Sequence, residues 1–180
     1  MGKVHPPSLV TPLVALLLAR EEDYAPLVGE LEQLFGPREL ESPVYPFTYT
    51  DYYRAAMGAD LKRRFATFRR LADPADLVSW KLATNALEER WSAASAGRGP
   101  ARPVNVDPGY LTSAKLVLAS TKDFAHRVYL REGIFAEVTL TFRNGVWESH
   151  PYTFPDYRSG LYDPFLKQVR ELHLWKAGGR

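Results

Sequence analysis

An uninterrupted apolar run, Leu13–Ala19, is the feature that most constrains the fold of this chain. The run is too short to cross a membrane as a helix, which takes about 20 residues. It is not typical of a signal peptide either, because prolines precede it and a charged segment without a small-residue cleavage site follows it. A strand that is apolar at every position is covered on both faces. The run therefore predicts a strand in the middle of a sheet.

The segments that follow alternate between helix and strand patterns. Helices are predicted where apolar residues recur at intervals of three and four, at Asp23–Phe35 and, after the capping pair Asp73-Pro74, along Leu77–Trp91. Strands are expected in three other segments: Pro43–Tyr53, Leu61–Leu71 and Leu111–Ser120. The order strand, helix, strand, strand, helix, strand is typical of a ferredoxin-like sandwich.

The last third of the chain predicts an addition to that core. Strands are expected at Arg127–Arg131 and Ile134–Phe142, Asn144-Gly145 is a strong hairpin signal, and Asp163-Pro164 marks a final helix. We therefore predict an α+β fold with a ferredoxin-like βαββαβ core over residues 10–120, extended by a C-terminal β-hairpin and a terminal helix over residues 121–177. A length of 180 residues fits a single domain over residues 1–180.

Composition excludes some classes of site. The chain has no cysteine, which excludes disulfides, thiolate metal sites and cysteine nucleophiles, and we expect a cytoplasmic protein. A net charge of +2 is too small to indicate nucleic-acid binding by itself. His5, His150 and His173 lack the spacing of metal ligands, so we expect no metal site.

Several segments carry a family pattern. They are Pro103–Thr112, with its N-V-D-P-G-Y-L motif, Lys115–Tyr129, Ala136–Leu140 and Phe154–Ser159, together with the earlier Phe47–Tyr53 and Thr84–Glu88. On these motifs the chain resembles the domain-of-unknown-function family 4416 over nearly its whole length. The resemblance implies no settled activity. Relatives sometimes carry a GTP-binding label, but this sequence has no G-x-x-x-x-G-K-[ST] stretch, so a P-loop is not the basis of that label.

Polar residues able to bind a ligand or transfer a proton gather between Asn105 and Arg158, at the ends of the expected strands. Asn105 and Asp107 share one strand parity and offer paired acceptors, although Asp107-Pro108-Gly109 is also a turn signal. Asp123 and His126 lie three residues apart, and a helical turn would place them on one face. A carboxylate beside an imidazole favours acid–base catalysis. In the alternative, Asp123 caps a turn and His126 is an exposed surface residue.

Glu137 lies inside an apolar strand segment. On an exposed face it is an ordinary surface residue, whereas on a covered face its carboxylate needs a partner because an unpaired buried charge is costly. The candidate catalytic residues are Asp107, Asp123, His126 and Glu137.

Cations and aromatic residues in the same stretch are typical of a binding site. Lysine and arginine side chains can meet a phosphate or carboxylate, and the proline-led loop around Asp156 either closes over a ligand or caps the last helix. The candidate ligand-binding residues are Asn105, Tyr110, Lys115, Lys122, Arg127, Tyr152, Asp156, Tyr157 and Arg158. We expect Asp107, His126 and Asp156 to lie in one concave region.

Three functions fit these residues. We favour the binding of a small anionic ligand, such as a nucleotide, at a site in the C-terminal half. The alternative is RNA binding by the basic segment Lys62–Arg70 with Phe65 and Phe68, although the signature of an RNA-recognition module is missing. A third hypothesis is a non-catalytic scaffold subunit that meets a partner chain through the aromatic stretch Tyr45–Tyr53. The sequence points to no particular cofactor, reaction or oligomeric state, and to no membrane.

Overall fold

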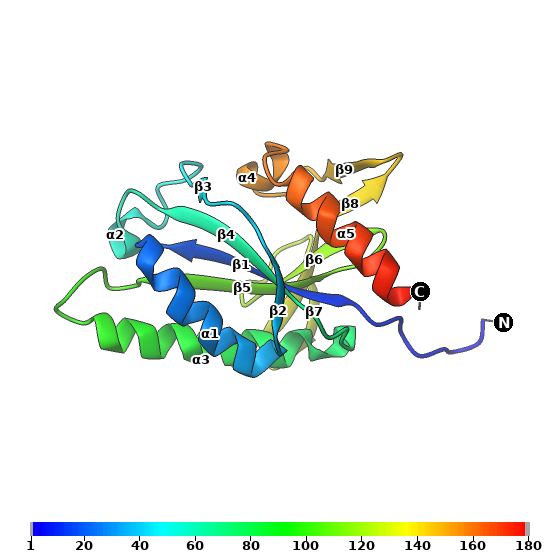
Figure 1. Ribbon diagram of the computed structural model, residues 1–180, viewed down its shortest axis with the longest axis horizontal. Helices are drawn as coiled ribbons and strands as arrows, with labels where there is room; N and C mark the ends of the chain where they lie inside the picture. The colour runs from blue at the N-terminus through cyan, green and yellow to red at the C-terminus, as the bar shows by residue number, and fades with distance from the viewer. Residues whose placement is uncertain (1, 179–180) are drawn as a thin grey trace.

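A computed structural model describes residues 2–178, and its strands form one sheet in which neighbouring strands are antiparallel (Figure 1). The main path of the sheet runs β2-β4-β1-β5-β6-β8-β7, while β3 pairs with β4 and β9 pairs with β8. The strands are β1 (Thr11–Leu18), β2 (Arg38–Glu41), β3 (Tyr45–Pro46), β4 (Lys62–Phe68), β5 (Val104–Leu111), β6 (Lys115–Ser120), β7 (Val128–Arg131), β8 (Ile134–Arg143) and β9 (Val146–Ser149).

Helices cover both faces of this sheet. They are α1 (Tyr24–Phe35), α2 (Arg54–Met57), α3 (Leu77–Ser95), α4 (Pro155–Arg158) and α5 (Asp163–Ala177), with short 3-10 turns at Glu21–Asp23 and Pro74–Asp76. Figure 1 shows α1 and α3 on one face of the sheet and α5 on the other. The mixture of helices with an antiparallel sheet confirms the α+β class. No helix among the described residues is both long and apolar enough to span a membrane.

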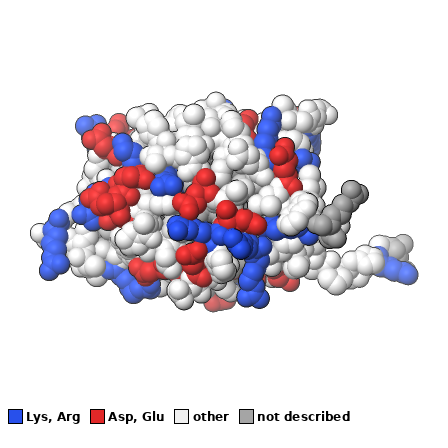
Figure 2. Space-filling view, in the orientation of Figure 1, with Lys and Arg blue, Asp and Glu red and all other residues white. Residues whose placement is uncertain are grey.

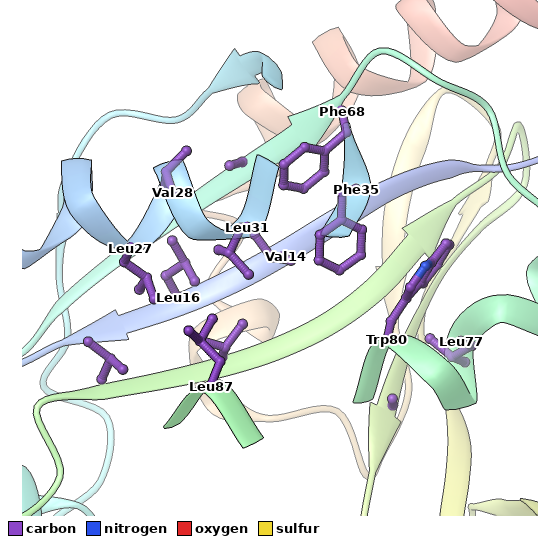
Figure 3. Close-up of a cluster of buried hydrophobic side chains, with 14 of the residues drawn as sticks. Val14, Leu16, Leu27, Val28, Leu31, Phe35, Phe68, Leu77, Trp80 and Leu87 are labelled. Carbon is purple, nitrogen blue, oxygen red and sulfur yellow. The ribbon is translucent and has the colours of Figure 1, made fainter. Parts of the chain in front are cut away.

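Strand β1 is the centre of the packing. It lies between β4 and β5, and each of its residues is buried, which confirms the central strand predicted from the apolar run. Val14 and Leu16 belong to the cluster on the side of α1 and α3 (Figure 3). Leu13 and Ala15 belong to a second cluster that includes Phe165 of α5. The alternation of side chains along a strand thus supplies both layers of the core.

Several predicted elements agree with the structure. The first helix ends at Phe35 as expected, and α5 begins at Asp163. The turn between β8 and β9 is formed by Asn144 and Gly145, with φ angles of 50° and 81°. Positive φ at both central residues is the geometry that an Asn-Gly pair favours in a two-residue hairpin.

Other elements differ from the prediction at the sheet edge and at a helix end. Only Tyr45–Pro46 of the expected strand Pro43–Tyr53 pairs with a neighbour, and the polar strand β2 precedes it. The side chains of β2 are exposed or half-buried, so the strand carries no apolar pattern that would reveal it. Residues 92–95 continue α3 beyond Trp91, where the predicted helix segment ends.

The largest correction concerns Asp107-Pro108-Gly109, which was interpreted as a turn and lies inside β5. A strand that the sequence did not predict, β5, thus precedes β6, and the expected strand Leu111–Ser120 is divided at residues 112–114. Pro108 is tolerated because its nitrogen points to the same edge as that of Val106, and the pairing of β5 with β6 begins only at Gly109.

Gly109 is needed where β6 first approaches β5. A Cβ atom at this position would lie 2.2 Å from the backbone oxygen of Val117 and 2.6 Å from a methyl group of Leu118. A glycine inside a strand commonly marks such a close approach. The glycine is thus required by packing between strands and not by a turn.

We predict that Gly109→Ala destabilises the protein by about 1–3 kcal/mol, because the added methyl group forces β5 and β6 apart. Urea unfolding measures the effect. The matched control is Gly29→Ala in α1, where an added Cβ meets nothing within 4 Å. The control is expected to be neutral or stabilising, since alanine favours a helix more than glycine does. An unchanged unfolding midpoint for Gly109→Ala would contradict this account.

Candidate functional site

The sheet opens between β5 and β6, and a cavity of about 570 Å³ lies at the opening. The two strands pair only between Gly109–Leu111 and Leu116–Leu118. Beyond this short ladder, Asn105 and Asp107 of β5 line one side of the cavity, and residues 118–122 line another. A volume of this size is within the range of small-molecule sites, roughly 300–1,000 Å³.

The open edge of β5 is closed by two side chains of α3. Val106 has no strand neighbour on this edge, and its N–H donates to Glu88 Oε1 at 2.9 Å while its carbonyl accepts from Lys81 Nζ at 3.1 Å. Both side chains are buried. Because unpaired backbone groups are costly inside a protein, these two bonds allow the strands to diverge without a penalty at Val106.

Asp107 faces the cavity from within a network of donors. Lys81 Nζ donates to its Oδ1 at 3.1 Å, and Asn105 Nδ2 donates to its Oδ2 at 2.7 Å. Burial alone would raise the pKa of Asp107, but the charges of Lys81 and Arg63 and these hydrogen bonds hold that pKa below its usual value. The carboxylate is therefore ionised at neutral pH, and its side chain, 29% exposed, is available as an acceptor for a ligand.

Arg102 joins this network from the other side. Its guanidinium donates to Glu88 Oε2 and to Asn105 Oδ1. Burial raises the pKa of Glu88, against the opposing charges of Lys81 and Arg102. The alternation of cations and carboxylates holds Asp107 and Asn105 rigidly in the cavity wall.

Arg63 is a buried cation of the cavity wall. Its side chain is 6% exposed, and Nη2 donates to Asp156 Oδ2 at 3.2 Å. Asp156 accepts a second bond from the hydroxyl of Tyr162. The Nε and Nη1 atoms of Arg63 have no hydrogen-bond partner among the described residues, and the same is true of the buried hydroxyl of Tyr157. Three donors are thus unpaired in one part of the cavity wall.

Glu137 is buried, so its carboxylate needs partners, and it has three, the first of which is the Thr139 hydroxyl, which donates to Oε1 at 3.4 Å. Arg127 Nε donates to its Oε2 at 2.9 Å, and His126 Nε2 lies 3.1 Å from the same oxygen. Arg127 also donates to Ser120 Oγ and to the carbonyl of Lys122. These bonds connect Ser120 at the end of β6, Arg127 just before β7 and Glu137 in β8.

The predicted pair of Asp123 and His126 is not formed. Asp123 is exposed and makes no side-chain bond within residues 2–178. The ring of His126 instead stacks between Phe124 and Tyr152, with a centroid distance of 4.3 Å to Tyr152. His126 contacts Glu137 and does not line the cavity.

The structure thus separates the sequence candidates into two groups. Seven of them line the cavity: Asn105, Asp107, Lys122, Arg127, Glu137, Asp156 and Tyr157. The others lie outside it: Tyr110, Lys115, Asp123, His126, Tyr152 and Arg158. Asp107 and Asp156 both line this concave region, whereas His126 does not line it and contacts two lining residues, Phe124 and Glu137.

Sequence reasoning missed the contribution of the N-terminal half. Arg63 was noticed only as one of several basic residues, although it lies two residues from the apolar Phe65 on the same strand face. Lys81 and Glu88 were missed, yet they follow Leu77 and Thr84 by four residues and so belong to the buried stripe of α3. A charged residue at a core position of a helix was the signal that could have found them.

The site offers side chains for binding an anion more than for binding a metal. No group of three or more His, Asp or Glu residues in the described part of the chain is arranged to hold a metal ion. Arginine and lysine outnumber carboxylates in the cavity wall, with Arg63, Lys81, Arg102, Lys122 and Arg127 against Asp107, Glu137 and Asp156. The chemistry is that of charge-assisted hydrogen bonds.

Comparison with known proteins identifies a family. The model of the domain of unknown function DUF4416 matches residues 9–173, so the chain belongs to this family, as the sequence motifs indicated. No curated protein and no solved structure matches the chain.

We predict that Lys81→Met destabilises the protein by about 1–3 kcal/mol, because it leaves the Val106 carbonyl and Asp107 without their donor. Denaturant unfolding measures the loss. Lys167→Met in α5, a lysine with no ion pair among the described residues, serves as the control and should change little. Combining Lys81→Met with Asp107→Asn should cost less than the sum of the two single changes. Strict additivity would show that the two side chains do not interact.

Proposed function

We propose that this member of the DUF4416 family binds a small anionic ligand, such as a nucleotide, in the cavity between β5 and β6. The observation that carries the proposal is Arg63, a guanidinium 95% buried in the cavity wall whose Nε and Nη1 have no partner among the described residues. Buried donors in native proteins are nearly always paired, so two unpaired N–H groups in a residue that lines a cavity favour an acceptor from outside the chain.

The charge of the cavity wall supports the same ligand class. Lys122 and Arg127 add positive charge on the side opposite Asn105 and Asp107. Each of the three lining carboxylates is paired with a cation of the wall, whereas Lys122 makes no ion pair among the described residues, so its charge remains to attract an anion. Asp107 accepts hydrogen bonds from the hydroxyl or amino groups of a ligand.

We also propose that β1, α1, β2, β4, α3 and β5 form a ferredoxin-like core. The order β2-β4-β1-β5 supports it, because in this core each helix joins two parallel strands that have an antiparallel strand between them. The location of α1 and α3 on one face of the sheet agrees with it (Figure 1). Strands β6 to β9 then extend the sheet beside β5, and β6 and β8 contribute residues to the far wall of the cavity.

RNA binding receives less support. The aromatic residues offered for base stacking, Phe65 and Phe68, are fully buried, and Arg63 is buried beside them. Figure 2 shows positive and negative side chains interspersed on the face that it displays, without a broad basic field for a phosphate backbone. The scaffold hypothesis relied on the aromatic stretch Tyr45–Tyr53, of which Phe47, Tyr49, Tyr52 and Tyr53 line the cavity.

We predict that calorimetric titration detects binding of one or more nucleoside monophosphates to the protein. Lys122→Met should weaken that binding by about three- to tenfold, which corresponds to about 0.7–1.4 kcal/mol, because a cation at the cavity is lost. Lys115→Met is the matched control, since Lys115 is an exposed lysine at the start of β6 outside the cavity.

Equal effects of the two lysine changes would contradict this location of the site. Arg127 is less suited to this test than Lys122. Its side chain is only 5% exposed and is bonded to Glu137 and Ser120, so Arg127→Ala is expected to lower stability as well as affinity. Lys122 is therefore the better residue for testing affinity alone.

A further inference from the structure

We infer that the ligand binds with its oxyanion inward and a planar ring outward: Arg63 and Tyr157 bind the anionic group deep in the cavity, and Tyr52 and Phe124 hold the ring at the mouth. This inference rests on the proposed function and specifies its ligand class. The ligand is a phosphate monoester, or a compound with an equivalent terminal oxyanion, that carries an aromatic ring several bonds away.

The deep end is a site built for an oxyanion. The guanidinium carbon of Arg63 lies 5.9 Å from the centroid of the Tyr157 ring, and both side chains are about 95% buried. Arg63 Nε and Nη1 and the Tyr157 hydroxyl are unpaired donors there. Burial, only partly opposed by the charge of Arg63, raises the pKa of Tyr157 well above its usual value, so the hydroxyl keeps its proton and donates. Hydrogen bonds from a buried guanidinium to an oxyanion are among the strong ones in proteins.

Asp156 orients the Arg63 guanidinium and does not neutralise its charge completely. It accepts from Arg63 Nη2 and from Tyr162. One nitrogen of the guanidinium, Nη2, is thereby engaged, while Nε and Nη1 have no partner among the described residues. An arginine held in this way has less rotational freedom to lose when it binds an anion.

The mouth of the cavity has a different character. Three lining aromatic residues are more than half exposed: Tyr52 at 65%, Phe124 at 54% and Phe154 at 51%. They come from three separate segments, the loop before α2, the loop after β6 and the start of α4. Large apolar side chains that gather around one opening are typical of a surface that stacks against a ring.

Cations hold two of these rings in place. Lys122 Nζ donates to the Tyr52 hydroxyl at 3.1 Å and lies 4.5 Å from the centre of its ring. Arg127 lies 5.0 Å from the centre of the Phe124 ring. The difference in burial between Arg63 and these aromatic residues gives the site its polarity, with the anion inside and the ring outside.

This polarity predicts how the site selects ligands. The oxyanion meets buried, directional donors and should be essential for affinity. The ring meets exposed aromatic faces, which every nucleobase can stack on, so discrimination between bases should be weak. Asp107, between the two ends, accepts from a hydroxyl group such as those of ribose.

The first test compares fragments on the unchanged protein. Calorimetric titration is performed with AMP, GMP, CMP and UMP, with the nucleoside of the tightest binder, and with ribose 5-phosphate. We expect the nucleotide to bind at least about tenfold more tightly than the nucleoside and several-fold more tightly than ribose 5-phosphate, each decade being about 1.4 kcal/mol. A nucleoside that binds as tightly as its nucleotide would overturn the inference.

The second test separates the two ends with variants. The Tyr157→Phe variant lacks only an unpaired hydroxyl, so it should fold normally. Its affinity for ribose 5-phosphate should fall by about three- to tenfold, about 0.7–1.4 kcal/mol, and its affinity for the nucleoside should not change. Tyr52→Leu should lower the affinity for the nucleotide several-fold and leave the affinity for ribose 5-phosphate unchanged. The matched controls are Tyr110→Phe and Tyr129→Leu, which alter a half-buried and an exposed tyrosine outside the cavity and should have no effect.

The outcomes distinguish the inference from the function on which it rests. If none of the probes binds the unchanged protein, the proposed function is wrong and the inference fails with it. If nucleotides bind but Tyr157→Phe and Arg63→Lys both bind ribose 5-phosphate as tightly as the unchanged protein, the function stands and the orientation is wrong. If Tyr52→Leu lowers the affinity for ribose 5-phosphate as much as the affinity for the nucleotide, the ring of the ligand is not held at the mouth of the cavity.

Discussion

Val106 lies in the part of β5 whose outer edge is not paired with β6, and its N–H and carbonyl must find partners inside the protein. Glu88 and Lys81 of α3 supply them. Without these two bonds, β5 would leave unpaired backbone groups in a buried position, or β6 would have to close against it and fill the cavity. The opening of the sheet, and therefore the site, depends on two charged residues in the buried face of a helix.

The same arrangement determines the charge of the site. Lys81 is held by a backbone carbonyl and by Asp107, so the carboxylate that faces the cavity is already paired with a protein cation. Arg63 differs, because Asp156 satisfies only one edge of its guanidinium. A buried charge that is only partly paired contributes little to folding, and often opposes it. Its presence in the cavity wall is better explained by binding than by stability.

Much of the fold was predictable because it rests on local patterns. The central position of β1 follows from its uniform apolar character, and the Asn144-Gly145 hairpin follows from the conformational preference of two residues. Strand β2 was missed since its polar side chains carry no pattern, and pairing with β4 alone makes it a strand. The site was predictable in part: Asp107, Glu137 and Asp156 were named, but the cation nearest to Asp156, Arg63, comes from 93 residues away in the chain.

The sequence by itself determined the two long helices α1 and α3, the central position of β1, the Asn144-Gly145 hairpin and that polar groups gather after residue 105. Periodicity and turn chemistry act over a few residues, so these features are visible without coordinates. The tertiary structure decided that Asp107-Pro108-Gly109 is a strand and not a turn, because an approach between backbones requires Gly109 and an unpaired edge tolerates Pro108. It also decided which charges meet. Pairing across the sheet brings residues together by register and not by distance along the chain, and local pattern carries no information about it.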